Sequence, residues 1–270
     1  MKITFLGGGN MANALIGGML KQGFAAADIT VIDPGSEARQ KLSDSYGIAC
    51  FASADEISNV GDLLLLSVKP QQMKEATAPL CSKLGKALVV SIAAGLNIAT
   101  LSRFLDGHAD IVRCMPNTPA LIGAGITGLC ASSAVNAEQR AAADRVLSAV
   151  GSTLWIEDEN QMDGVTAVSG SGPAYVFLFI EALQQAAADL GFTPEQGRQL
   201  AIETVQGAAA LAAQSSEPAA TLRERVTSKG GTTEAALNMM AEQGVKAGII
   251  AGVKAAEARG QELGKLLGAG

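Results

Sequence analysis

The chain has 270 residues, of which 48% are hydrophobic and 17% are charged. That length accommodates one large or two modest domains around a substantial core. The formal net charge of −6 argues against nucleic acid or an anionic membrane surface as the main partner. Four widely spaced cysteines and a single histidine form no metal-ligand pattern, so we expect no metal and reduced, buried thiols.

The start of the chain predicts a nucleotide-binding unit. Residues 2–6 form a β-type run, and the next six residues, GGGNMA, fit the pattern G-x-G-x-x-A before an apolar helical stripe. A second β-type run over residues 29–32 leads directly into Asp33. In a dinucleotide-binding fold, Gly7 would make the turn and Gly9 would let the pyrophosphate approach the backbone. The alternative is a glycine turn with a structural role only.

The first 155 or so residues alternate β-type runs with helical patterns. The run over residues 62–68 is almost continuously apolar, as expected of a strand buried on both faces of a parallel sheet. This alternation predicts a doubly wound α/β sheet. The remaining predicted strands cover residues 48–51, 87–92, 110–114, 126–130 and 152–156, and the helices cover 36–46, 71–84, 98–105 and 136–150, with a helical turn at 54–59.

Four segments follow predicted strands and are therefore expected at the carboxyl edge of the sheet, where open α/β sheets bind ligands. Lys69 is the only cation among them. It either lies near cofactor phosphates or substrate, or simply ends a strand. The cofactor contacts predicted along the chain are Leu6, Gly7, Gly8, Gly9, Asn10, Met11, Asp33, Ser67, Val68, Lys69, Pro70, Ala93, Ala94, Gly95 and Asn117.

An acidic stretch at residues 157–160 marks the predicted boundary between a dinucleotide-binding domain (1–158) and an all-helical domain (159–270). Helices in this second half are rich in alanine and leucine but have little core of their own to fill. We therefore expect burial against a second subunit, because obligate dimer interfaces resemble a domain core cut in half. The alternative is a self-contained helical cap. The predicted helices cover residues 167–190, 194–214, 218–226, 233–243 and 245–267.

Two features favour the cytoplasm. The first residues hold one lysine and a short strand rather than a signal peptide. The apolar run that begins at Pro173 is stopped by Glu181 and is too short to span a bilayer. We therefore expect a cytoplasmic protein with no membrane partner.

The most distinctive segment of the helical half is SKGGTT, residues 228–233. Its two glycines permit a tight turn, and its two threonines follow where a helical pattern begins. A helix N-terminus presents free N–H groups and so favours an anion such as a carboxylate. The alternative is a Gly-Gly turn followed by a threonine N-cap.

Six motifs give the chain a resemblance to a known family. They are FLGGGNM from residue 5, SVKP from 67, SIAAG from 91, RCMPNTP from 113, VSGSGPAY from 168 and GGTT from 230. With these motifs the chain resembles pyrroline-5-carboxylate reductases over nearly its whole length. The resemblance implies a Rossmann domain followed by a helical domain that interlocks two subunits, a substrate pocket at their interface, and dimers that assemble into larger rings. It also implies reduction of 1-pyrroline-5-carboxylate to L-proline by NADPH or NADH, the last step of proline biosynthesis.

The resemblance assigns roles to the GGTT segment. It implies that Thr233 is the catalytic residue, bonded to the ring nitrogen of the substrate, and that Gly230, Gly231, Thr232 and Thr233 bind the substrate. The backbone amides of Gly231, Thr232 and Thr233 would hold the substrate carboxylate. Because a threonine hydroxyl is a poor acid, we expect Thr233 to orient the substrate and to relay a proton through water.

The sequence departs from the family pattern at two places. Lys229 stands where the family more often has proline. No arginine directly follows Asp33, and an acidic residue there usually bonds the ribose diol and repels the 2′-phosphate of NADPH. The choice between NADPH and NADH therefore stays open, since Ser36 or Arg39 could contact that phosphate.

Three other classes compete with this interpretation. A dehydrogenase of the β-hydroxyacid type needs a catalytic lysine in its helical domain, and the lysines here do not form that family's pattern. A reductase of another cyclic or open imine would share the same features. A non-catalytic NAD(P)H-binding regulator predicts cofactor binding without turnover, but it leaves the GGTT segment unexplained.

Overall fold

The computed structural model describes residues 1–268 and contains two compact units. Unit 1 consists of Met1–Ser171 together with the residues from Ala256 onward, and unit 2 consists of Gly172–Ala255. The division of the sequence into domains at residue 158 stays a prediction. By compactness, residues 159–171 group with unit 1, as do the last turns of the C-terminal helix.

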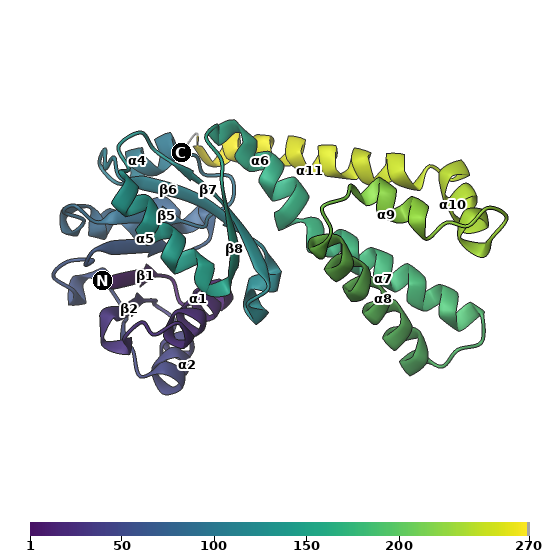
Figure 1. Ribbon diagram of the computed structural model, residues 1–270. Helices are drawn as coiled ribbons and strands as arrows, with labels where there is room; N and C mark the ends of the chain where they lie inside the picture. Colours follow the sequence, from purple (N-terminus) through teal and green to yellow (C-terminus); the bar gives the residue numbers. More distant parts are fainter. Residues whose placement is uncertain (269–270) are drawn as a thin grey trace. The chain divides into compact units, whose positions relative to one another are not determined.

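Unit 1 is built on one eight-stranded sheet with the order β3-β2-β1-β4-β5-β6-β7-β8 (Figure 1). Strands β1 to β6 are parallel, β7 is antiparallel to β6, and β8 is parallel to β7. The reversal at β7 reflects its short link to β6, because a parallel connection needs a crossover of a dozen or more residues. The predicted doubly wound sheet is confirmed, with two reversed strands at one edge. The strands are β1 (Ile3–Leu6), β2 (Ile29–Ile32), β3 (Ala49–Phe51), β4 (Leu63–Leu66), β5 (Leu88–Ser91), β6 (Ile111–Pro116), β7 (Gly125–Ala131) and β8 (Gly151–Trp155).

Helices cover both faces of this sheet. Helices α1, α2 and α5 contribute to a buried cluster with Phe5 and Leu65, while α3 and α4 contribute to a second cluster with Leu64 and Leu66. Because successive side chains of β4 enter opposite layers, both layers require apolar residues, which explains the run of four leucines. The helices of this unit are α1 (Asn10–Lys21), α2 (Ser36–Tyr46), α3 (Met73–Thr77), α4 (Ile98–Phe104), α5 (Ala137–Leu147) and α6 (Met162–Val165).

Unit 2 is entirely helical in its regular structure. Helix α8 begins with a reciprocal cap, in which Gln196 N–H donates to Thr193 Oγ1 and Thr193 N–H donates to Gln196 Oε1. Helices α7 and α8 approach closely, since a Cβ built on Gly197 would lie 3.2 Å from the Ala187 methyl. The helices are α7 (Gly172–Asp189), α8 (Pro194–Gln214), α9 (Ala219–Arg225), α10 (Thr232–Glu242) and α11 (Val245–Gly268), the last of which continues into unit 1.

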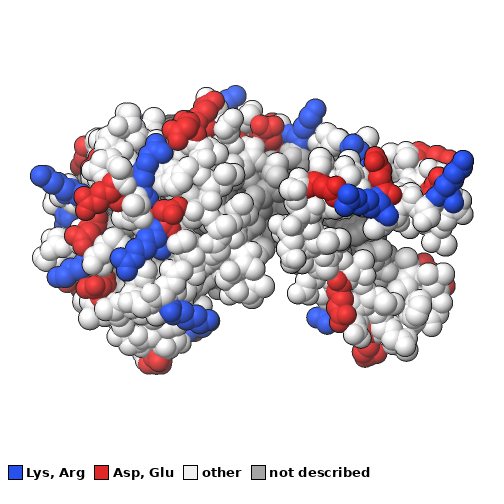
Figure 2. Space-filling model, viewed as in Figure 1, with Lys and Arg blue, Asp and Glu red and all other residues white. Residues whose placement is uncertain are grey.

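Helix α7 carries large apolar side chains on the surface of the single chain. Phe177 is 64% exposed and Leu178 is 65% exposed. By length and composition alone, the helical stretch Glu159–Asp189 could cross a membrane, and its most apolar part is only 6% buried. On the face that Figure 2 shows, both signs of charge are interspersed with wide uncharged areas. The exposed apolar surface therefore calls for a covering partner.

Candidate nucleotide and substrate sites

The glycine turn after β1 is held by a serine at the end of the neighbouring strand. Gly7 has φ of +102°, and a Cβ built on it would lie 2.9 Å from both the carbonyl carbon and the carbonyl oxygen of Ser67. The Ser67 hydroxyl donates to the carbonyl oxygens of Leu6 (3.0 Å) and Gly7 (2.8 Å). Glycine is therefore required at position 7 both by its backbone conformation and by the space available.

Gly9 differs from Gly7 because it borders open space. It is the N-cap residue of α1 with φ of −70°, and a Cβ built on it would meet no atom within 4 Å. Helix α1 has no side-chain cap and no acidic residue in its first turn. The N–H groups at the start of this helix are thus free of a side-chain cap and favour an anion.

Asp33 is turned toward the glycine turn. Its Oδ2 accepts a hydrogen bond from the Gly8 N–H at 2.6 Å, and its Oδ1 accepts one from the Gly35 N–H at 2.7 Å. Arg39 Nη1 donates to the carbonyl oxygens of Asp33 (2.7 Å) and Pro34 (2.8 Å). Asp33 is therefore fixed between the glycine turn and the start of α2, with Arg39 holding the backbone in between.

A cavity of about 750 Å³ opens at the carboxyl edge of the sheet, a size that suits a nucleotide. Seven of the predicted cofactor residues line it: Leu6, Gly7, Gly9, Asp33, Ser67, Val68 and Lys69. Lys69 thus lines a ligand-sized cavity, and it does not end the strand, because β4 ends at Leu66 and Lys69 precedes the 3-10 turn Pro70–Gln72. Four other predicted residues do not line it: Gly8, Asn10, Met11 and Pro70.

Part of the cavity wall consists of residues that were not predicted from the sequence. Ala52, Ser53 and Ala54 follow β3 and line it, and the same rule about carboxyl ends of parallel strands could have found them. Gln72, Glu75, Ala76 and Pro79 also line it. These four residues come from the helical segment after β4, where no local sequence signal marks a ligand contact.

The predicted residues after β5 and β6 do not line this cavity. Ala93 is buried, Ala94 is exposed, and Gly95 has φ of +79°. Asn117 is fixed at both ends of its amide, since Oδ1 accepts the Ile126 N–H (3.0 Å) and Nδ2 donates to Ser169 Oγ (3.3 Å).

Ser169 was not among the predicted site residues. It lies in a π-helical turn, Thr166–Gly170, within the VSGSGPAY motif. Single π turns occur often at functional sites. The motif itself was the available signal, but nothing in the sequence indicated that Ser169 would bond Asn117.

The GGTT segment of unit 2 forms a glycine turn and the start of α10. Gly230 has φ of +70°, and Gly231 is the N-cap, so both threonines lie inside the first helical turn. The alternative of a threonine N-cap is therefore wrong. The Gly230 N–H donates to Glu234 Oε2 at 2.7 Å, and Thr233 is half-buried.

The N-terminus of α10 has no side-chain cap on its N-cap residue. Its first-turn N–H groups are thus candidates for binding a carboxylate. Glu234 stands in the same first turn and supplies a negative charge of its own, so a bound carboxylate would lie at the amides of residues 231–233 rather than beside Glu234.

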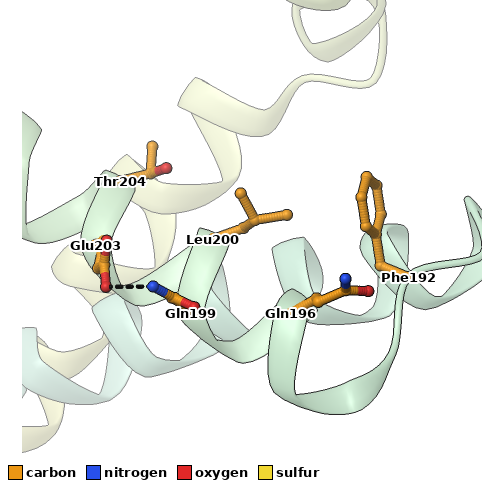
Figure 3. Close-up of a pocket in the computed structure, with 6 residues that line it drawn as sticks. All are labelled: Phe192, Gln196, Gln199, Leu200, Glu203 and Thr204. Carbon is orange, nitrogen blue, oxygen red and sulfur yellow. Dashed lines mark hydrogen bonds between the residues drawn. The ribbon is translucent and has the colours of Figure 1, made fainter.

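A further hollow of about 560 Å³ runs along α8 (Figure 3). Within it Gln199 Nε2 donates to Glu203 Oε1 at 3.0 Å, and the exposed side chains of Phe192 and Leu200 supply apolar surface. None of the predicted site residues lines this hollow, which is also bordered by Gln196 and Thr204.

The four cysteines are free, and none is a candidate nucleophile. Burial raises the pKa of all four thiols, and it raises that of Cys114 well above its usual value. Cys114 and Cys130 are buried as expected, whereas Cys50 and Cys81 are only partly buried. A raised pKa keeps a thiol protonated and unreactive.

Comparison with known proteins agrees with both halves of this description. Residues 2–95 match the family described as NADP oxidoreductase, coenzyme F420-dependent, and residues 159–263 match pyrroline-5-carboxylate reductase dimerisation. The chain therefore has the features of a dinucleotide-dependent oxidoreductase: a glycine turn that leads into a helix without a side-chain cap, a nucleotide-sized cavity and a helical second half.

Full-length relatives specify this class further. The chain is 46% identical to pyrroline-5-carboxylate reductase of Pseudomonas aeruginosa over 99% of its length and 98% of the relative's, and 42% identical to that of Haemophilus influenzae over 97% of each. The chain belongs to the pyrroline-5-carboxylate reductase family. These enzymes use NAD(P)H to reduce 1-pyrroline-5-carboxylate to L-proline, the final step of proline biosynthesis.

Solved structures agree with this assignment. The reductase of Coxiella burnetii superposes with a TM-score of 0.91 at 37% identity, covering 97% of this chain and 98% of that one. The Plasmodium falciparum enzyme, solved with NADP bound, superposes with a TM-score of 0.87 at 28% identity, covering 98% of each chain.

Proposed function

We propose that this chain reduces 1-pyrroline-5-carboxylate to L-proline, with the cofactor held at the glycine turn of unit 1 and the substrate held at the GGTT turn of unit 2. The observation that carries the proposal is that α1 and α10 each follow a turn with a positive-φ glycine, Gly7 or Gly230, and begin without a side-chain cap. They supply two sites for anionic groups. A pyrophosphate and a carboxylate are the anions that this reaction brings.

The residues of unit 1 fit a nicotinamide dinucleotide. The open space at Gly9 admits the pyrophosphate, and the first N–H groups of α1 donate to it. Asp33 accepts a hydrogen bond from a hydroxyl of the adenosine ribose. Each of its carboxylate oxygens already accepts one hydrogen bond from a backbone N–H and keeps a further lone pair. When bound, the reduced nicotinamide supplies the hydride.

The residues of unit 2 bind and orient the substrate. The N–H groups of Gly231, Thr232 and Thr233 hold its carboxylate at the start of α10. The Thr233 hydroxyl bonds the ring nitrogen and relays a proton to it through water. Since a protonated imine is already electrophilic, positioning and one proton path are sufficient chemistry for a chain with one histidine.

We propose that NADH is the preferred cofactor and that NADPH is also accepted. The cavity wall carries two carboxylates, Asp33 and Glu75, against one cation, Lys69. A 2′-phosphate would bring further negative charge beside Asp33. Arg39 offsets that charge only in part, because its Nη1 is engaged with the carbonyl oxygens of Asp33 and Pro34.

We further propose that a second copy of the chain covers the apolar surface of unit 2. The dimerisation match spans residues 159–263 and includes α7, so a protein partner accounts for the exposed Phe177 and Leu178 without a membrane. The hollow along α8 lies in the same matched segment.

Dimers then assemble into a larger ring, and the enzyme works in the cytoplasm. Light scattering in detergent-free buffer tests this assembly, and a monomer there would contradict it.

The first experiment measures oxidation of NADH and of NADPH with freshly made pyrroline-5-carboxylate. We expect turnover with both cofactors and a higher kcat/KM for NADH. Cofactor binding without turnover would overturn the reductase assignment and favour the non-catalytic regulator. A higher kcat/KM for NADPH would contradict the cofactor preference alone.

The second experiment tests the role of Thr233. We expect Thr233→Ala to lower kcat/KM by about 10-fold or more, the range of a lost positioning hydrogen bond and its proton path. The dissociation constant for NADH should not change, since Thr233 does not lie in unit 1. Thr221→Ala, on α9, is the matched control. Unchanged steady-state kinetics in Thr233→Ala would remove this residue from the mechanism.

A further inference from the structure

Arg113 is a buried charged residue within β6, the sixth strand in the order of the sheet. It lies in β6, three residues before Pro116, and its side chain is 6% exposed. Nη1 lies 3.1 Å from Glu159 Oε1, and Nη2 lies 3.2 Å from Asp163 Oδ1. One guanidinium therefore joins β6 to two carboxylates, Glu159 in the 3-10 turn before α6 and Asp163 within α6.

Glu159 extends this network to the segment that follows β5. Its Oε1 also accepts the N–H of Ile98 at 2.7 Å. Ile98 is the first residue of α4 and follows the predicted cofactor segment Ala93–Gly95. Arg113 and Ile98 thus share one acceptor atom, so the position of the Ala93–Gly95 segment depends on the orientation of the Glu159 carboxylate.

Asp163 extends the network to the last turns of α11. A Cβ built on Gly260 would lie 3.6 Å from Asp163 Cβ, and one built on Gly264 would lie 3.0 Å from the Gly95 carbonyl oxygen. Small residues at 260 and 264 thus let α11 lie against both Asp163 and the Ala93–Gly95 segment. All of these residues belong to unit 1.

Stability alone accounts poorly for such a network. A buried arginine with two carboxylates carries a large desolvation cost, and apolar replacements of buried ion pairs are often as stable or more so. What this network does supply is a fixed geometry. One of the six family motifs, RCMPNTP, contains Arg113 itself. Two others lie close along the chain, since Ile98 follows SIAAG by three residues and Asp163 precedes VSGSGPAY by five.

We infer that Arg113 is a positioning residue for the reaction: through Glu159 and Asp163 it holds the Ala93–Gly95 segment, the end of β6 and the start of α6 in one fixed arrangement. The expected change in kcat rests on the proposed function. The expected changes in Ile98 amide exchange and in cofactor binding do not depend on turnover.

The test compares two conservative variants with a matched control. Glu159→Gln keeps the shape of the side chain but removes the charge that pairs with Arg113. Glu157→Gln changes the same residue type two positions earlier, in an exposed pair with Arg140, where Glu157 is 81% exposed. Arg113→Lys keeps the positive charge but cannot bond two carboxylates in the fork geometry of arginine.

Three measurements are made on each full-length variant: thermal unfolding, hydrogen exchange of the Ile98 amide by NMR, and binding of NADH by fluorescence. We expect Glu159→Gln and Arg113→Lys to speed exchange at Ile98 and to weaken NADH binding by about 10-fold, the scale of one lost charge-assisted hydrogen bond. kcat should fall at saturating substrate, and Glu157→Gln should match the parent protein in every measurement.

The inference is overturned if both variants lose thermal stability while NADH affinity, Ile98 exchange and kcat per folded molecule stay unchanged, because the network is then structural only. Failure of the proposed function would look different. The parent protein would bind NADH without reducing pyrroline-5-carboxylate, and the exchange and binding arms of the test would still decide the role of Arg113.

Discussion

The two flanking glycines of the G-x-G-x-x-A turn provide a test that separates folding from cofactor binding. Gly9→Ala places a methyl group where no protein atom lies within 4 Å, at φ of −70° that alanine adopts freely. Gly7→Ala places it 2.9 Å from the Ser67 backbone at φ of +102°. The first change should affect the ligand alone, and the second should affect the fold.

The magnitudes follow from these surroundings. For Gly7→Ala we expect a loss of about 2 to 3 kcal/mol in the free energy of unfolding, from the unfavourable φ and the backbone clash together. At roughly 2 to 4 °C per kcal/mol, the melting temperature should fall by about 4 to 12 °C. For Gly9→Ala, the poorer N-cap and the reduced entropy of the unfolded chain nearly cancel, so the change should stay within about 1 kcal/mol.

The assay measures melting temperature by circular dichroism with and without NADH, and NADH affinity by fluorescence. We expect Gly9→Ala to raise the dissociation constant by about 10-fold or more, because Cβ occupies the approach of the pyrophosphate. At a ligand concentration of about 100 times the parent dissociation constant, NADH would stabilise the parent by about 2.7 kcal/mol and the variant by only about 1.4 kcal/mol.

Two outcomes would refute this reasoning. If Gly9→Ala binds NADH as tightly as the parent, the open space beside Gly9 is not the pyrophosphate site. If Gly9→Ala loses as much stability as Gly7→Ala, position 9 has a constraint in the fold that its surroundings do not explain.

Two further predictions concern Asp33 and the buried thiols. Asp33→Ser removes the carboxylate from the cavity and leaves Arg39 in place, so the ratio of kcat/KM for NADPH to kcat/KM for NADH should rise by about 10-fold or more. The control Asp44→Asn, later on α2, should leave this ratio unchanged. An unchanged ratio in Asp33→Ser would contradict the proposed role of Asp33. Burial raises the pKa of the Cys114 thiol in the folded protein. The contribution of the protonated thiol to the free energy of unfolding is therefore complete below the pKa of the unfolded thiol, about 8.5 to 9. It is lost as the pH rises from that value through the higher pKa of the folded protein. Chemical unfolding across alkaline pH should therefore show a fall in stability that is shallower in Cys114→Ala, and equal slopes in both proteins would contradict this assignment.

The sequence predicted the sheet well because the signals there are local. All eight strands coincide with β-type runs, and the glycine pattern located the turn after β1. The reversal of β7 was not predicted, because strand direction depends on how the chain returns to the sheet rather than on the composition of the strand.

The prediction of the site was less complete because much of it depends on tertiary contacts. The far cavity wall comes from a helical segment with no motif, and the bond between Asn117 and Ser169 joins residues distant in the chain. The GGTT segment shows a subtler limit. Its composition suited a threonine N-cap, but the N-cap is Gly231, because the turn at Gly230 begins the helix one residue earlier.

The path of α11 also bears on how the protein is made. The chain leaves unit 1 after Ser171, builds the whole of unit 2, and returns only at Ala256. The contacts of Gly264 with Gly95 and of Arg103 with the carbonyl oxygen of Gly268 therefore join segments synthesised far apart in time. We expect the nascent nucleotide-binding unit to emerge from the ribosome early but to remain unfinished until the last turns of α11 have been made, so that this unit is completed only after the helices of unit 2.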